Sequence, residues 1–394
     1  MRIYLDYAST TPIDKKVWKA MKPYFQKDFY NPSAIYKEGV EVKKKVNEAR
    51  ATIARILNAQ ASDIIFTGNG TESINLAIRG TVEAFRKKNP EKIPHIITSV
   101  IEHSSTLEVC RSLEMEAKAL VTYLLVDKDG KVKAEDVEKA LRDETILVTI
   151  MFANNEIGTI EPIKEIARRV KLWKIDKKRN AEDYPFIHTD ASQAGNYCLL
   201  DREKLGIDMM TLDGHKIYGP KGIALLYIKK YIPCVSIIGG GGQENGLRPG
   251  TENVSGIIGM AKALEITQDI KERESKRLII LRDYFITELL KIIPKAKING
   301  SREDRLPNNI NFCIPNVNAE FLVLLLDAKG IACASLSSCE NLNSESISYV
   351  VGSLPDGEKC SRSSIRLSMG RGTGKGDLKD VLKVLPELIM KAKS

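Results

Sequence analysis

The sequence predicts an α/β protein, with a large domain built on a mostly parallel sheet and a smaller α+β domain. Short apolar runs of strand length alternate with stretches of helical period over the first two thirds of the chain. This alternation is typical of a parallel sheet covered by helices on both faces. Near residue 260 it gives way to one long charged helical pattern. A length of 394 residues is enough for about two such domains.

Six apolar runs are the expected strands of the large domain. In chain order they are 63–68, 95–100, 146–154, 186–191, 209–214 and 223–228. Helical patterns accompany them at 36–57, after Gly70 and at 133–144, and the long helix is expected at 258–293. We place the large domain at residues 15–262 and the small domain at residues 1–14 and 263–394.

Composition and charge describe an ordinary globular protein, with 43% hydrophobic and 28% charged residues. No apolar run is long enough for a membrane span, and Asp6 precedes any apolar core of a signal peptide. We therefore expect a cytoplasmic protein. The net charge is +9, but the lysines are scattered and the densest cluster, 171–180, has no interleaved aromatic residues. This pattern disfavours direct nucleic-acid binding and is compatible with an acidic partner protein.

The seven cysteines form no Cys-x-x-Cys pair and are odd in number. They give neither a simple disulfide framework nor zinc-ribbon spacing, so no metal site is expected. We expect reduced, mostly buried and inert thiols, as in a reducing compartment.

Polar side chains follow the expected strands where the strands end. In open α/β sheets, ligands bind beyond the carboxyl ends of the strands, so these side chains should converge on one edge. The polar residues are Thr71, Glu102, His103, Asn154, Asn155, Asp190, Gln193, His215 and Lys216, and Gly70 directly precedes Thr71.

Each of these residues also has a purely structural interpretation. Thr71 could only cap a helix, His103 could be a satisfied core imidazole, and Lys216 could be a surface lysine. Asp190 could simply bond a neighbouring loop.

Taken together, the residues suit a flat, phosphorylated, aldehyde-bearing cofactor, which is pyridoxal 5′-phosphate (PLP). The glycine-flanked start of a helix at Gly70 and Thr71 attracts a phosphate. A carboxylate at Asp190 pairs with a pyridinium N–H, and Gln193 can donate to a phenolate oxygen. The Lys216 amine can bond the aldehyde as a Schiff base.

The order of the motifs resembles that of the NifS/IscS-type cysteine desulfurases. The motifs are "YLDYASTTP", "NPSA", "GTES", "EHSS", "NNEIG", "HTDASQ", "GHKIYGPKG", "RPGTEN" and "SSIRLSMGR", and they span nearly the whole chain. The resemblance implies the PLP-dependent transferase fold of type I, with a seven-stranded sheet in the large domain, and a homodimer. It also implies removal of sulfur from L-cysteine to give L-alanine and a cysteine persulfide. That sulfur would go to an iron–sulfur scaffold or another acceptor protein.

The resemblance also implies residue roles. Lys216 is expected to hold the cofactor, and His103 is expected to stack on the ring and to act in acid–base catalysis. The remaining cofactor positions are Gly70, Thr71, Asn155, Asp190, Gln193, Asp213, His215 and Thr251, the last reaching the phosphate of the other subunit. The substrate carboxylate is expected to meet Asn31, Asn155 and Arg366.

The expected nucleophile is Cys339, in the small-residue stretch "ACASLSSCENLNSESIS", with Cys333 expected in the core. The spacing to Arg366 resembles that of the class I enzymes, which have the longer loop.

Asp213 departs from the family, which usually has a hydroxyl residue there. A carboxylate about 5 Å from a phosphate costs about 3 kcal/mol per charge pair at an effective dielectric near 20. Asp213 should therefore either turn away to cap a turn or leave the phosphate to Thr71, His215 and Thr251.

Two other functions are compatible with these residues. One is a selenocysteine lyase or related PLP β-lyase, because the fold does not fix the substrate. The other is a non-catalytic sulfur-relay or scaffold partner with a degraded site.

Overall fold

The computed structural model describes residues 2–335 and 347–393. Its large part is a seven-stranded sheet in the order β2-β8-β7-β6-β5-β3-β4. Neighbouring strands are parallel except for β8, which is antiparallel to β2 and to β7. The strands are β2 (Ile64–Thr67), β3 (His95–Ser99), β4 (Leu120–Leu124), β5 (Thr145–Thr149), β6 (Phe186–Asp190), β7 (Met209–Asp213) and β8 (Ala224–Ile228). The predicted α/β fold with a mostly parallel sheet is confirmed.

Six of these strands coincide with the six expected apolar runs, and β4 is the additional one. β4 lies at the edge of the sheet, and only its last residue, Leu124, is fully buried. An edge strand that is half exposed carries a weaker apolar signal than a central strand.

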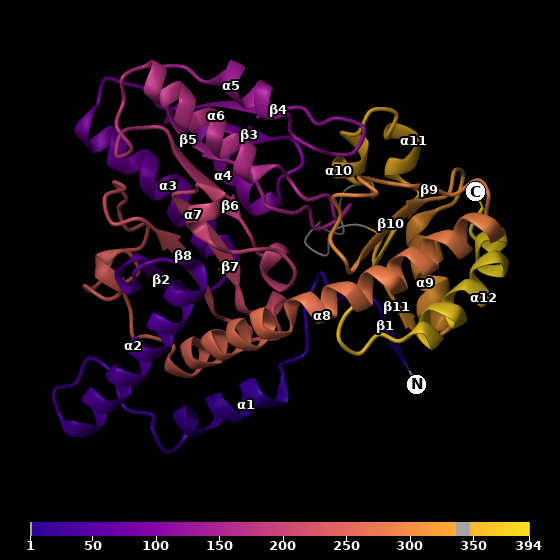
Figure 1. Cartoon of the computed structure of the whole chain (residues 1–394), viewed down its shortest axis with the longest axis horizontal. Helices are drawn as coiled ribbons and strands as arrows, with labels where there is room; N and C mark the ends of the chain where they lie inside the picture. The colour runs from indigo at the N-terminus through magenta and orange to yellow at the C-terminus, as the bar shows by residue number, and fades with distance from the viewer. Residues whose placement is uncertain (1, 336–346, 394) are drawn as a thin grey trace.

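Helices surround this sheet (Figure 1). They are α1 (Lys15–Met21), α2 (Lys37–Leu57), α3 (Gly70–Lys88), α4 (Ser104–Met115), α5 (Ala134–Ala140), α6 (Ile163–Asp176) and α7 (Arg202–Leu205). The side chain of Asn69 accepts a hydrogen bond from the backbone of Glu72 and so fixes the start of α3 directly after β2.

The long helix α8 (Val254–Ile292) runs from the large part to the small part of the molecule (Figure 1). Ile257 and Leu264, in its first half, belong to the core around the sheet. Leu278 and Phe285, in its second half, belong to a separate apolar core. Because α8 is continuous, the predicted boundary at residues 262 and 263 falls inside a helix, and the two-domain division stays a prediction.

Within the described residues, the small part contains two short sheets and four further helices. One sheet has the order β12-β10-β9 and the other pairs β1 with β11. The elements are β1 (Ile3–Tyr4), β9 (Lys297–Ile298), β10 (Asn309–Cys313), α9 (Ala319–Ala328), β11 (Ile331–Ala332), α10 (Tyr349–Gly352), α11 (Glu358–Ser361), β12 (Ser364–Ser368) and α12 (Lys375–Lys391).

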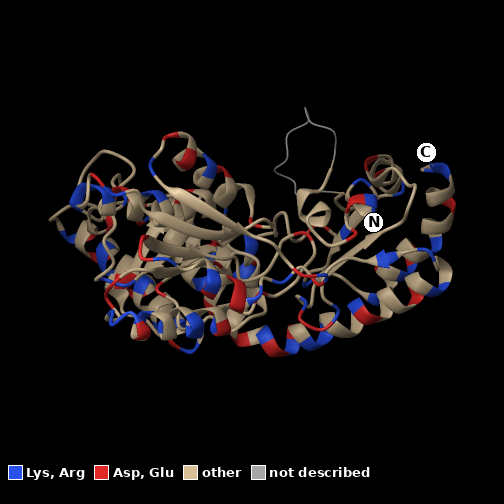
Figure 2. Ribbon diagram, turned by 90° about the horizontal axis from the view of Figure 1, so that it is seen from above, with Lys and Arg blue, Asp and Glu red and all other residues tan. Residues whose placement is uncertain are grey.

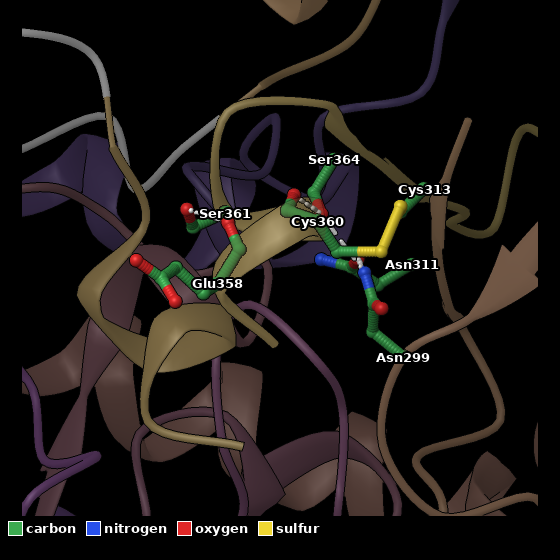
Figure 3. The surroundings of a disulfide bond; sticks show 7 residues. All are labelled: Asn299, Asn311, Cys313, Glu358, Cys360, Ser361 and Ser364. Carbon is green, nitrogen blue, oxygen red and sulfur yellow. Dashed lines mark hydrogen bonds between the residues drawn. A yellow bond between two sulfur atoms is a disulfide. The ribbon is translucent and has the colours of Figure 1, made fainter. Parts of the chain in front are cut away.

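The expectation that the cysteines are all reduced is wrong at one pair. Cys313 at the end of β10 and Cys360 in α11 form a disulfide, and both are buried (Figure 3). Beside the bond, the Ser364 hydroxyl donates to the carbonyl of Cys360, and the Asn299 amide donates to that hydroxyl. The two cysteines are 47 residues apart, so no local spacing pattern announces the pair.

Basic and acidic side chains are interspersed along the helices (Figure 2). In this view the basic residues behind the net charge of +9 are spread over many helices and are not confined to one of them. Within the ranges described, each helix is too short or too polar to cross a lipid bilayer.

Candidate active site

A cavity of about 200 Å³ lies at the carboxyl ends of the central strands. β6 ends at Asp190, and β7 leads directly into the 3₁₀ turn Gly214–Lys216. Ten residues predicted from the sequence line this cavity, and they come from segments far apart in the chain. They are Gly70, Thr71, His103, Asn155, Asp190, Gln193, Asp213, His215, Lys216 and Arg366.

Lys216 is half-buried in the cavity wall. Its Nζ donates to the backbone carbonyls of Ala8 (2.7 Å) and Ser9 (2.8 Å). The N-terminal segment therefore orients this amine at the carboxyl edge of the sheet. The placement agrees with a lysine that bonds a ligand in the cavity and not with a solvated surface lysine.

Asp190 and Gln193 lie three residues apart at the end of β6, and each is fixed by a hydrogen bond. Asp190 is buried, and its Oδ1 accepts from the backbone N–H of Ser192 at 2.9 Å. The amide of Gln193 donates to the carbonyl of Ala8 at 2.9 Å, the same carbonyl that binds Lys216. A buried carboxylate here can pair with a cationic N–H of a ligand.

His103 is half-buried, and its Nδ1 accepts from the backbone N–H of Ser105 at 3.2 Å. Burial lowers the pKa of His103, and the Lys216 cation lowers it further, whereas the Asp190 and Asp213 carboxylates raise it. Since Nδ1 accepts the backbone hydrogen bond, the proton of the neutral ring lies on Nε2.

The first turn of α3 forms one end of the cavity. A Cβ atom added to Gly70 would lie 3.1 Å from Asp213 Oδ2 and 3.5 Å from Ser192 Oγ, so any larger residue at this position would crowd the Asp213 carboxylate and narrow this end of the cavity. Thr71 follows on the same turn and also lines the cavity. A helix N-terminus with hydroxyl groups beside it suits a phosphate.

Asp213 combines the two behaviours that the sequence left as alternatives. Its Oδ1 accepts from the backbone of His215 (3.2 Å) and bonds His215 Nδ1 (2.6 Å), and so it caps the 3₁₀ turn. Its Oδ2 accepts from the backbone N–H of Gly70 at 2.8 Å and so remains inside the phosphate end. The Asp213 carboxylate therefore occupies the backbone N–H of Gly70, a donor that a bound phosphate would otherwise use.

Arg366 and Asn155 form the other end of the cavity. Arg366 is 2% exposed. Its two Nη atoms donate to the carbonyl of Asn155 (3.1 Å), the carboxylate of Asp6 (2.8 Å) and the hydroxyl of Ser9 (2.9 Å). Among the described residues, Arg366 Nε and Asn155 Oδ1 have no hydrogen-bond partner although both are buried. Such orphaned groups are costly unless a ligand completes them.

Two predicted residues, Asn31 and Thr251, are not part of this cavity wall. Asn31 is exposed, and its side chain accepts from the backbone of Ser33. Thr251 is exposed on the loop before α8. Cys339 lies outside the described residues. The roles predicted for these three stay predictions.

The cavity wall also contains polar residues that were not singled out from the sequence. Ser105 bonds His103 Nδ1 through its hydroxyl at 2.8 Å. Ser192 faces the Gly70 turn. Both lie inside motifs quoted above, "EHSS" and "HTDASQ", so their proximity in sequence to His103 and Asp190 was the available signal.

These residues fit PLP, because the cavity brings together the required groups. Gly70 and Thr71 offer a phosphate end, Asp190 offers an anion for the ring nitrogen, and Lys216 offers an amine for the aldehyde. The fold and the cavity define a PLP-dependent enzyme of fold type I.

The comparisons with known proteins agree with this class. The profile of the aminotransferase class-V family matches residues 3–381, and the chain belongs to that family. The chain is 43% identical to a protein named cysteine desulfurase IscS of Dictyoglomus turgidum, over 100% of this chain and 95% of that protein. It is also 43% identical to the cysteine desulfurase IscS of Methanosarcina thermophila, over 100% and 93%.

Solved structures of similar sequence also match this fold over nearly the whole chain. A NifS-like protein superposes with a TM-score of 0.89 at 32% identity, over 99% of this chain and 100% of that chain. The structure described as SspA in complex with cysteine superposes with a TM-score of 0.77 at 34% identity, over 94% and 99%.

Proposed function

We propose that the protein is a cysteine desulfurase that takes sulfur from L-cysteine and leaves L-alanine. The observation that carries this proposal is a single cavity with Lys216 in its wall and, at one end, the buried guanidinium of Arg366. Relatives named cysteine desulfurase over the full chain support it, as does a structural neighbour described with cysteine. These names favour a desulfurase over a selenocysteine lyase, and the ten predicted residues that line one cavity disfavour a non-catalytic scaffold.

Bound PLP would supply an electron sink for the bond changes at the substrate Cα and Cβ atoms. Arg366 Nε and the side chain of Asn155 would bind the carboxylate of cysteine and orient it. The Nζ of Lys216 would take the proton from Cα. His103, neutral because its pKa is lowered, would accept or return a proton through its ring.

Cys339 remains the proposed nucleophile. Burial raises the pKa of Cys110, Cys198, Cys234 and Cys333 to about 12, so these described free thiols are poor nucleophiles at neutral pH. The Cys339 thiolate would attack the substrate sulfur. The new S–S bond leaves a persulfide on the enzyme, and the electrons of the broken C–S bond return to the carbon skeleton, which becomes alanine after protonation.

The test compares Cys339→Ser with Cys333→Ser as the matched control. We expect the wild type and Cys333→Ser to form alanine from L-cysteine and to carry one persulfide per chain after a single turnover without reductant. Cys339→Ser should keep the cofactor absorbance and lose the persulfide. Full turnover by Cys339→Ser would show that another group is the nucleophile, and no alanine from the wild type would refute the proposed function.

We further propose a homodimer. Phe29 is 65% exposed and Ile35 is 97% exposed on one N-terminal segment, as expected of side chains that a second subunit covers. Thr251 is also exposed, in keeping with a role at a neighbouring subunit's site. Sedimentation of the purified protein should give twice the mass of the chain, and a monomer at micromolar concentration would contradict this proposal.

The proposed sulfur acceptor is an iron–sulfur scaffold or another protein, and the net charge of +9 would favour an acidic one. We also propose a cytoplasmic location, because four described cysteines are free thiols; the buried Cys313–Cys360 disulfide would persist there, since a reductant reaches it only when the fold opens.

A further inference from the structure

The segment 348–361, which we call the anchor segment, connects the stretch carrying Cys339 to β12, the strand of Arg366. It contains α10 and α11, and its two ends meet where the Ser348 N–H donates to the carbonyl of Ser361 at 3.0 Å. Its apolar side chains Val350, Val351 and Leu354 belong to the core of the large sheet and not to the core of the small part. The segment is therefore a folded unit seated on the large part of the molecule.

Two hydrogen bonds tie the start of the anchor segment to residues beside the cavity. The hydroxyl of Ser348 donates to Glu156 Oε2 at 2.6 Å, and both side chains are at most 1% exposed. The hydroxyl of Tyr349 donates to the carbonyl of Glu102, also at 2.6 Å. In sequence, Glu156 directly follows Asn155 and Glu102 directly precedes His103. Ser348 and Tyr349 are thus hydrogen-bonded to the sequence neighbours of two cavity residues.

The other end of the anchor segment is fixed covalently. The disulfide joins Cys360 to Cys313 on β10, and Cys313 pairs with Ser364 on β12 (Figure 3). Arg366 lies two residues further along β12. The disulfide thereby fixes the end of the segment close to the strand that holds the proposed carboxylate-binding arginine.

On the N-terminal side of Cys339, Ala334 is hydrogen-bonded to Arg366, the same arginine that lines the cavity. The backbone of Ala334 exchanges two hydrogen bonds with that of Arg366, at 2.7 and 3.2 Å. Cys339 is the fifth residue after Ala334. An extended chain of five residues spans at most about 18 Å. Both ends of the stretch, Ala334 and Ser348, are therefore held by residues of the cavity or next to it.

We propose that Glu156 is a positioning residue for sulfur transfer: its carboxylate holds Ser348, the residue at which the chain coming from Cys339 enters the anchor segment, next in the chain to the cavity residue Asn155. This inference rests on the proposed desulfurase function. The Glu156 backbone is fixed independently, because its N–H donates to Asn154 and its carbonyl accepts from the side chains of Asn309 and Asn311. Removing the carboxylate should therefore release Ser348 without displacing the backbone next to Asn155.

Glu156 does not line the cavity, so its loss should affect neither cofactor binding nor substrate binding directly. Misplacing a reacting group lowers the rate of the chemical step and leaves binding intact. We therefore expect kcat for alanine formation to fall about 10-fold or more, with KM changed by less than about 2-fold.

The experiment uses the PLP-loaded enzyme and the variants Glu156→Met, Ser348→Ala and the double variant. Methionine fills a space similar to that of glutamate but cannot accept the hydrogen bond of Ser348. Glu161→Met is the matched control, since Glu161 is also a buried glutamate, but its carboxylate accepts from the backbone of Val132. The measured quantities are kcat, KM, the cofactor absorbance spectrum and the melting temperature.

We expect each single variant to lose kcat with KM and absorbance unchanged, and the double variant to lose no more than the worse single variant. Wild-type kcat in either single variant, additive losses in the double variant, loss of cofactor, or an equal loss in Glu161→Met would overturn the positioning role. Ser348→Ala also removes the bond from the Val351 N–H that caps α10. If Glu156→Met does not fold, Ser348→Ala therefore decides only if its melting temperature stays at the wild-type value while kcat falls, and wild-type kcat in it overturns the positioning role. Failure of the proposed function is recognised separately, because the wild type would then form no alanine.

Discussion

Removing the Cys313–Cys360 disulfide should lower the free energy of unfolding by about 4 kcal/mol. The bond closes a ring with a sequence separation of 47 residues. In the chain-entropy treatment, such a ring restricts the unfolded chain by about 14 cal/mol/K, which is about 4 kcal/mol at 25 °C. Both cysteines are buried, so the folded protein should keep the bond in mild reductant and lose it only on opening or unfolding.

The first assay counts thiols in the unfolded, unreduced protein. Of the seven cysteines in the chain, two form the disulfide, so five should react with a thiol reagent, and all seven should react after reduction.

The second assay is urea unfolding with excess PLP. It compares the oxidised wild type, the wild type refolded with a dithiol, and the double variant Cys313→Ala/Cys360→Ala. Both altered forms should unfold at lower urea. The double variant also loses the side-chain packing of the two sulfur atoms. The oxidised and reduced forms of the wild type differ only in the disulfide, so their comparison isolates its contribution. Seven thiols without reduction, or equal stability of the oxidised and reduced wild type, would refute this reasoning.

Three further predictions concern the cavity. Because burial lowers the pKa of His103, its imidazole signal, followed by NMR in the cofactor-free protein and assigned with His103→Gln, should titrate below the ordinary histidine value of 6.5; a midpoint above 6.5 would contradict this. Burial raises the pKa of Glu102 from 4.5 to about 8, so the folded protein keeps a proton that the unfolded chain releases, and stability should fall as the pH rises through this window. Glu102→Gln should lack that part of the pH dependence. If the free energy of unfolding falls by the same amount between pH 5.5 and 8.5 in the wild type and in Glu102→Gln, the prediction is wrong. Asp213→Ser should free the N–H of Gly70, remove a negative charge from the phosphate end and slow the loss of PLP on dialysis, whereas equal or faster loss would show that Asp213 does not oppose the phosphate.

The sequence was sufficient to predict the cavity because parallel strands end at a common edge. Asp190 and Lys216 come from neighbouring strands, and their distance in space follows from the strand order. The edge strand β4 was missed because its side chains are half exposed.

The disulfide and the orientation of Asp213 could not be predicted for another reason. Cys313 and Cys360 come together only because β10 pairs with β12, which is a tertiary contact between distant segments. Asp213 can cap a turn or face a ligand, and only the positions of Gly70 and His215 show that it does both. Neither arrangement has a signature in local sequence.

The most direct measurement locates the cofactor on the chain. The PLP-loaded enzyme is treated with borohydride, digested and analysed by mass spectrometry, with Lys216→Ala treated in parallel. The pyridoxyl group should be found on the peptide that contains Lys216 and should be absent from the variant. A wild-type protein that is colourless with added PLP, or a label on a different lysine, would contradict the assignment of this cavity as the catalytic site.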